Sequence, residues 1–127
     1  MKKGISVMVV FTMLVAVWAF AGGKGKIAVA ANDKIPEASV SKQAGPSPFF
    51  LLFDEKGKLI EAIANPYKEA GSSGIAVADF LAGKGVTVVV AEGFGSRIVE
   101  VMKSKGIRAV AFKGSATEAV KKVLQVN

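Results

Sequence analysis

Turns rich in glycine and serine are the features of this sequence whose residue types and spacing point to chemistry. Gly71–Gly74, Gly93–Ser96 and Lys113–Ser115 each stand directly before a helical pattern. The start of a helix carries partial positive charge and unpaired backbone N–H groups, which attract anions. We therefore predict a site for an anion, or for an oxygen- or sulfur-rich cluster, formed by these turns. An alternative interpretation is that the glycines only serve tight turns and that Ser115 only caps a helix.

The predicted binding residues are those that follow the strands or precede the helices at one edge of the expected sheet. Lys34 is a further candidate that would add positive charge to this edge. The residue types still leave the identity of any metal ligand open. The predicted set is Asn32, Asp33, Ser41, Lys42, Gly71, Ser72, Ser73, Gly74, Gly93, Phe94, Gly95, Ser96, Arg97, Lys113, Gly114 and Ser115.

Several classes of chemistry are excluded or disfavoured by composition. The chain has no Cys and no His, which excludes disulfides, Cys- or His-ligated zinc, thiolate-held iron–sulfur clusters and imidazole-dependent triads. Gly93-x-Gly95 lacks the third glycine of a dinucleotide fingerprint, and no phosphate-loop pattern occurs. A metal-dependent hydrolase needs several clustered carboxylates, but only Asp33 and Glu92 follow strands. We therefore expect no catalytic residues and no enzymatic activity.

The elements that must position the predicted site form an α/β pattern. Short apolar runs predict strands over 26–31, 49–53, 58–63, 86–90 and 107–112. Three helical patterns follow the glycine turns described above. The order of elements indicates a mixed sheet of about five strands covered by about three helices. In such sheets ligands bind beyond the carboxyl ends of parallel strands. We therefore expect three segments that follow strands to converge there: Asn32-Asp33, Glu92–Ser96 and Lys113–Ser115.

Three local features refine this prediction. The sixteen residues from Asn32 to Ser47 have little periodicity, and loops of this length are usually functional or mobile. Gly57 ends a turn between two strands and suits a left-handed backbone conformation. Ser115 and Glu118 have the spacing of a capping box.

The N-terminal segment is typical of a secretory signal peptide. Lys2 and Lys3 precede an apolar run over 5–21, and Ala19-Phe20-Ala21 places small residues where a signal peptidase cleaves. We predict a signal helix over 1–21, cleavage after Ala21, one domain over 22–127 and a periplasmic or secreted location. The alternative is an uncleaved membrane anchor, because this apolar run of 17 residues approaches the length needed to span a bilayer.

The net charge of +7 indicates anionic partners or membrane surfaces. Export, together with the single Tyr and single Trp, argues against a nucleic-acid-binding surface. Contact with a membrane is expected only through an uncleaved N-terminal segment.

From Lys26 to Leu124 the chain resembles the dinitrogenase iron–molybdenum cofactor-binding family, small domains related to nitrogenase accessory proteins. The resemblance implies a ribonuclease-H-like α/β fold and binding or transport of iron–molybdenum or molybdenum–copper sulfide clusters without catalysis. It depends on an ordered series of short segments: Lys26–Ala30, Val40-Ser41, Pro48–Asp54, Glu61–Pro66, Gly74-Ile75, Phe80–Val86, Gly93–Gly95 and Lys105–Ile107.

The sequence departs from the family pattern at two places. Family members often have Val-Ser-x-His-Phe-Gly where this chain has Val40–Gly45, and a second common His is replaced within Gly71–Gly74. A soft metal thereby loses its preferred protein ligands, which leaves Met, Asp, Glu or Asn for direct ligation. We expect a molybdenum-containing cluster or a metal oxyanion to be held as a preassembled anion by helix ends and Lys or Arg. The alternative function is a structural or protein-interaction module that has lost the cofactor.

Overall fold

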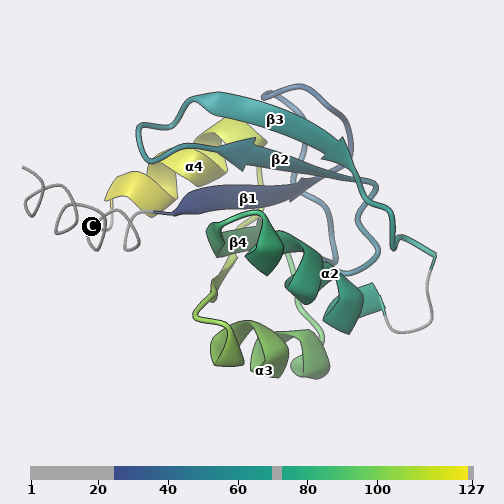
Figure 1. The fold of residues 1–127 in the computed structure, drawn as a ribbon. Coiled ribbons are helices and arrows are strands. Elements are labelled where there is room, and N and C mark those ends of the chain that lie inside the picture. Colours follow the sequence, from purple (N-terminus) through teal and green to yellow (C-terminus); the bar gives the residue numbers. More distant parts are fainter. Residues whose placement is uncertain (1–24, 70–72, 126–127) are drawn as a thin grey trace, which may run out of the picture.

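A computed structural model describes residues 25–69 and 73–125 (Figure 1). The predicted signal helix over 1–21, its cleavage site, Gly71 and Ser72 lie outside the described residues. Within the described residues, no helix combines the length and the apolar character needed to cross a membrane. The elements in chain order are β1 (Lys26–Ala31), β2 (Phe49–Phe53), β3 (Leu59–Ala64), α2 (Ser73–Gly83), β4 (Val86–Ala91), α3 (Ser96–Ser104), β5 (Arg108–Ala111) and α4 (Ala116–Gln125).

The five strands form one mixed sheet in the order β3-β2-β1-β4-β5. β1 pairs parallel with β4, and β4 pairs parallel with β5. β2 runs antiparallel to both of its neighbours, β1 and β3. With five strands and three helices in the part of the chain that the structure describes, this confirms the predicted mixed α/β fold.

Five strand boundaries differ by one residue from the prediction. β3 ends at Ala64, β4 at Ala91 and β5 at Ala111, and two strands begin later than predicted. β3 begins at Leu59 rather than Lys58, because the Lys58 carbonyl accepts a hydrogen bond from the Asp54 N–H in the preceding turn. β5 begins at Arg108 rather than Ile107, whose N–H instead donates to the Met102 carbonyl at the end of α3. At both of these starts, a hydrogen bond within the turn or to the helix end uses the backbone group that would otherwise pair with a neighbouring strand.

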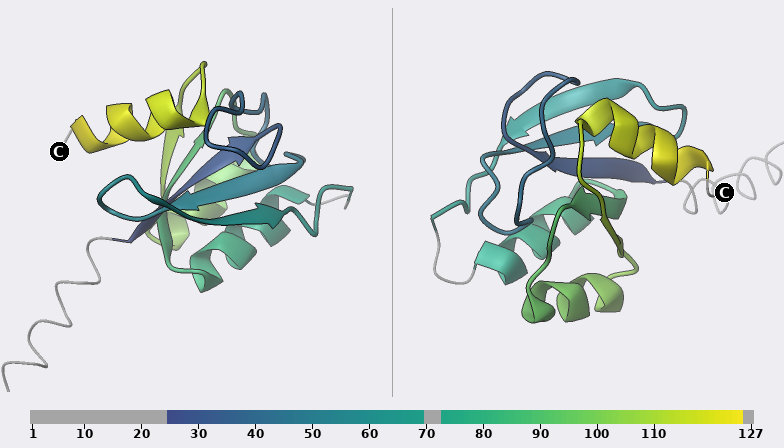
Figure 2. Two further views of the ribbon diagram at one scale, coloured as in Figure 1. Left: turned by 90° about the horizontal axis from the view of Figure 1, so that it is seen from above. Right: turned by 180° about the vertical axis from the view of Figure 1, so that it is seen from behind.

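Helices cover both faces of the sheet (Figure 2). Alternate strand residues therefore enter two separate cores, and this explains why residues 27–31 of β1 and all of β2 are apolar. Phe50 and Leu52 pack with α2 and α3 on one face. Leu51 and Phe53 pack with α4 on the other.

The two ends of the sheet hold different parts of the fold. β1, β3, β4 and β5 all point the same way, and the three helices return between or after them. The carboxyl end therefore holds the ends of these four strands and the starts of all three helices. The amino end holds the starts of the same four strands, the helix ends and the β2–β3 turn, as the left side of Figure 1 shows.

The β2–β3 turn is organised by Asp54. Its Oδ1 accepts hydrogen bonds from the N–H groups of Lys56 at 2.8 Å and Lys58 at 2.9 Å. Gly57 has φ +87°, which confirms the predicted left-handed position. The Lys58 N–H, followed by the Lys56 N–H and the two lysine charges, outweighs desolvation and lowers the pKa of Asp54 below its ordinary value of 3.8.

Asp54→Ala is expected to destabilise the protein at neutral pH, with a smaller effect in acid. Because folding lowers the pKa of Asp54, its charge contributes stability above the unfolded pKa, and this contribution is lost as pH falls through the folded value. Urea unfolding of the unchanged protein and of Asp54→Ala, from neutral pH to below the folded pKa of Asp54, measures the difference in their free energies of unfolding. Glu55→Ala, an exposed change in the same turn, is the control. A deficit for Asp54→Ala that stays constant with pH would contradict the role of the charge.

Candidate functional site

A strip of loop formed by residues 38–44 crosses the carboxyl end of the sheet. The Ser41 N–H donates to the Ala30 carbonyl of β1 at 2.7 Å, and the Ser41 carbonyl accepts from Glu92, just after β4, at 2.9 Å. The Val40 N–H donates to the Gly114 carbonyl, after β5, at 2.8 Å. The strip thus links the ends of β1, β4 and β5. It brings together the predicted residues around Ser41, Gly93 and Gly114.

At the start of α4, the backbone N–H groups are already occupied. Ala116 N–H donates to the Ala38 carbonyl at 2.9 Å, and Thr117 N–H donates to the Pro36 carbonyl at 3.0 Å. Ser115 and Glu118 form the predicted capping box, with reciprocal bonds of 3.0 and 3.2 Å. Ser115 therefore caps α4, as the alternative interpretation of the sequence predicted. Lys113–Ser115 lie beside the strip, but the first turn of α4 offers few free donors.

The start of α3 is open. Its N-cap is Gly95, which has an extended backbone and makes no side-chain cap. Among the described residues, the N–H groups of Ser96, Arg97 and Ile98 have no hydrogen-bond partner, and the first turn has no acidic side chain. A Cβ added at Gly95 would meet nothing within 4 Å. These N–H groups form the donor set that the sequence predicts for an anion.

Neighbouring segments surround this open helix start. A Cβ at Gly93 would lie 3.2 Å from both the Lys42 carbonyl and Gln43 Nε2, so the strip packs closely on this turn. A Cβ at Gly74 would lie 3.2 Å from Ile98 Cβ, so the start of α2 lies beside the start of α3. Phe94 is half-buried and packs on the core beneath α2 and α3.

The predicted residues therefore fall into two groups. We use the name α3 rim for Ser41, Lys42, Gly74 and 93–97, where Lys42 and Arg97 are exposed. Ser73 is the first residue of α2.

The second group makes local contacts near α4. Asn32 Nδ2 donates to Ser39 Oγ at 2.8 Å, and the Asp33 carboxylate accepts from the Lys34 N–H at 2.7 Å. The Lys34 ammonium lies 5.9 Å from the centre of the Phe49 ring. Lys34 is thus placed over an aromatic face rather than over the α3 rim.

The donors at the α3 rim suit an anion better than a bare soft metal. Within residues 25–69 and 73–125, no three Asp or Glu side chains come together as a metal-binding group. Soft metals prefer thiolate or imidazole ligands, which this chain lacks. Backbone N–H groups and guanidinium or ammonium groups instead bind the outer oxygen or sulfur atoms of an assembled anion.

One residue that sequence analysis passed over holds the carboxyl end together. Asn65 is 7% exposed, and its Nδ2 donates to the carbonyls of Gly45 at 2.8 Å and Ser47 at 2.9 Å. Its Oδ1 accepts from the Tyr67 N–H at 2.9 Å. A buried Asn directly before Pro66, at the end of a strand, is the sequence pattern that points to such a role.

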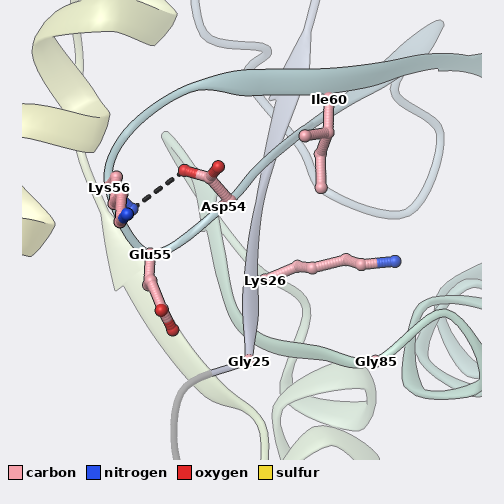
Figure 3. Close-up of a pocket in the computed structure, with 7 residues that line it drawn as sticks. All are labelled: Gly25, Lys26, Asp54, Glu55, Lys56, Ile60 and Gly85. Carbon is pink, nitrogen blue, oxygen red and sulfur yellow. Dashed lines mark hydrogen bonds between the residues drawn. The ribbon is translucent and has the colours of Figure 1, made fainter. Parts of the chain in front are cut away.

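Two pockets lie away from the α3 rim. The larger, of about 430 Å³, is at the amino end, where Lys26 extends between Ile60 of β3 and Gly85 before β4 (Figure 3). The second, of about 270 Å³, lies between α4 and the β2–β3 turn. Lys56 lines both pockets, whereas Lys121 lines only the second. Neither pocket includes a predicted binding residue.

Charge is distributed unevenly between the two ends. Glu61 and Asp79 belong with the amino end, because they pair with Lys84 at 3.6 Å and Lys105 at 2.7 Å. Glu100 lies midway along α3. The carboxyl end carries equal numbers of basic and acidic side chains: Lys34, Lys42, Lys68, Arg97 and Lys113 against Asp33, Glu37, Glu69, Glu92 and Glu118. The amino end carries a basic surplus: Lys26, Lys56, Lys58, Lys84, Lys103, Lys105, Arg108, Lys121 and Lys122 against Asp54, Glu55, Glu61 and Asp79.

Comparison with known proteins assigns the chain to a family. The family model described as dinitrogenase iron–molybdenum cofactor matches residues 24–126. The chain belongs to this family. The match spans every element of the described fold and confirms the resemblance found in the sequence. None of the curated proteins compared with the chain matches it.

Solved structures share the fold of this dinitrogenase iron–molybdenum cofactor family member. The apo form of the orange protein from Desulfovibrio gigas has a TM-score of 0.75 at 21% identity, over 81% of this chain and 89% of that one. A Thermotoga protein described as a NifB protein has a TM-score of 0.68 at 22% identity, over 80% and 88%. A Methanocaldococcus jannaschii protein described as a dinitrogenase has a TM-score of 0.57 at 10% identity, over 81% and 90%.

Proposed function

We propose that this protein is an exported, non-catalytic binding or carrier protein for an anionic metal–sulfur cluster or metal oxyanion of the iron–molybdenum or molybdenum–copper type. The open start of α3 is the observation that carries the proposal, because three N–H groups there have no partner among the described residues. Family membership supports a relation to the iron–molybdenum cofactor. We also assign the sheet order 3-2-1-4-5 to the ribonuclease-H-like class.

The proposed binding mode relies on backbone dipoles more than on net charge. Basic and acidic side chains balance at the carboxyl end, so long-range attraction there is weak. Helix N–H groups act at short range and are directional. Arg97 and Lys42 are exposed beside them and are the side chains proposed to contact the anion. The metal keeps the oxygen or sulfur ligands that it already has in the assembled anion, and the protein binds these outer atoms.

Export is proposed from the N-terminal sequence alone. Lys2 and Lys3, the apolar run over 5–21 and Ala19-Phe20-Ala21 support a cleaved signal peptide and a periplasmic or secreted location. An uncleaved anchor remains the alternative. N-terminal sequencing of the protein isolated from the cell envelope distinguishes the two, because cleavage leaves Gly22 as the first residue.

Titration of the purified protein with tetrathiomolybdate and with molybdate tests the proposed binding. We expect saturable binding of at least one of them with a dissociation constant well below millimolar, measured by calorimetry and by the visible absorption of the thiomolybdate. Sulfate at the same concentration is the control for nonspecific anion binding. Absence of binding at millimolar ligand would remove the proposal.

The second candidate is a protein-interaction module that has kept the fold without a cofactor. The segment Val40–Gly45 lacks the His common in the family, and the start of α4 is internally satisfied; both observations favour this alternative. Affinity purification of the tagged protein from envelope extracts is expected to recover a specific partner in that case. Recovery of metal with the protein and no partner would favour the carrier function instead.

A further inference from the structure

The basic surplus at the amino end is a separate feature from the α3 rim. Among residues 25–69 and 73–125, nine Lys or Arg side chains face four acidic ones there, whereas the carboxyl end is balanced. Lysines at helix ends stabilise helix dipoles, and this accounts for Lys103 and Lys122 in the last turns of α3 and α4. It does not account for Lys26 or Arg108 at strand starts, nor for Lys58 in the β2–β3 turn.

The described ion pairs reduce this surplus only in part. Lys84 pairs with Glu61 and Lys105 with Asp79, both on the side of α2. On the other side of the amino end, Lys56 and Lys121 line a common pocket, and Lys56 with Lys26 lines the larger one. Lys56, Lys58, Lys121 and Lys122 are all exposed. A group of exposed lysines from the turn and from α4 therefore presents its charge to the surroundings.

The chain also enters the domain at this end. β1 begins at Lys26, and the sequence directly before it contains Lys24 and the apolar run over 5–21. Clusters of Lys and Arg next to a membrane-inserting segment are attracted by anionic headgroups, with about 1 kcal/mol per residue near the surface. The positive charge and the point where the chain enters the domain therefore both indicate that the amino end faces the membrane surface.

We propose that the amino end of the domain docks on an anionic lipid surface, through Lys56, Lys58, Lys121 and Lys122. In this orientation the α3 rim, at the opposite end of the sheet, faces away from the membrane and stays open to solvent. The attraction is electrostatic and needs no insertion of the described domain. It operates on the full-length chain and also after removal of residues 1–21.

Lysine acetylation of the full-length protein in lipid nanodiscs tests this docking. One set of discs contains phosphatidylcholine alone, and the other contains roughly one third phosphatidylglycerol. The protein in both sets of discs carries the same N-terminal segment, so the two samples differ only in lipid charge. We expect Lys56 and Lys58 to react at least about threefold more slowly on the anionic discs, while Lys34 and Lys42 at the carboxyl end react equally on both. Salt at about 0.5 M is expected to remove the difference.

Two double variants with the same change in charge serve as the matched pair. Lys121→Glu with Lys122→Glu is expected to abolish the slower reaction of Lys56 and Lys58. Lys68→Glu with Lys113→Glu, at the carboxyl end, is expected to leave it intact. Circular dichroism confirms that each variant folds; if the first does not, Lys56→Gln with Lys58→Gln, read out at Lys121 and Lys122, replaces it.

Three results would overturn the proposal. Equal acetylation rates on both kinds of disc would show that lipid charge does not engage the amino end. Uniform slowing of all lysines, including Lys34 and Lys42, would show a general surface potential without orientation. The same protection by free glycerol 3-phosphate on neutral discs would show a site for a small soluble anion.

Discussion

Replacing Asn65 with alanine is expected to lower the free energy of unfolding by about 2 to 4 kcal/mol. The side chain is buried and makes three hydrogen bonds that tie the segment before β2 to the segment after β3. Alanine leaves the carbonyls of Gly45 and Ser47 and the N–H of Tyr67 without these partners. Each such buried group costs about 1 to 3 kcal/mol when water cannot replace the bond.

Urea unfolding followed by circular dichroism measures this loss, provided that the slope of the transition is unchanged. Asn32→Ala is the matched control, because Asn32 is exposed and its amide makes one bond to Ser39. We expect that control to cost less than about 1 kcal/mol. Equal losses for the two variants would show that water readily satisfies the groups around Asn65.

Ser96→Pro is expected to weaken binding of tetrathiomolybdate by about ten- to hundredfold while leaving the fold intact. This prediction rests on the proposed carrier function. Ser96 is the first residue of α3, a position where proline is well tolerated, and Gly95 already has φ −74° and ψ 154°, which a residue before proline prefers. The substitution therefore removes one free N–H donor without breaking a hydrogen bond of the helix.

The control is Ser96→Ala, which keeps the backbone N–H and removes only the hydroxyl. Calorimetric titration of both variants, with urea unfolding to confirm equal stability, separates the backbone donor from the side chain. Indistinguishable affinities for the two variants would mean that the start of α3 does not hold the anion. Binding that is lost in neither variant but is lost in Arg97→Ala would assign the site to side chains instead.

Local sequence patterns predicted most of the fold. The five residues Phe49–Phe53 are apolar at every position because both faces of β2 are covered, and the predicted bounds are those of the structure. The Ser115–Glu118 capping box and the left-handed Gly57 are also confirmed. These features depend on residues within a few positions of one another, so the local sequence contains the information.

The candidate site could be predicted only in outline. The sequence predicted binding residues at the starts of both α3 and α4, since each follows a strand and a glycine turn. The structure distinguishes them through contacts between distant residues. Thr117, for example, donates from both its N–H and its Oγ1 to the carbonyl of Pro36, 81 residues earlier. Asn65 was missed for the same reason, because its partners Gly45 and Ser47 precede it by 20 and 18 residues.

The sequence by itself determined the elements, their apolar faces, the absence of thiolate and imidazole chemistry and the family of the chain. Only the tertiary structure decided which helix start keeps free donors and which end of the sheet collects the positive charge. The physical reason is that propensity, capping and alternation act over a few residues. Satisfaction of backbone N–H groups and the summation of charge instead depend on where segments far apart in the chain meet in space.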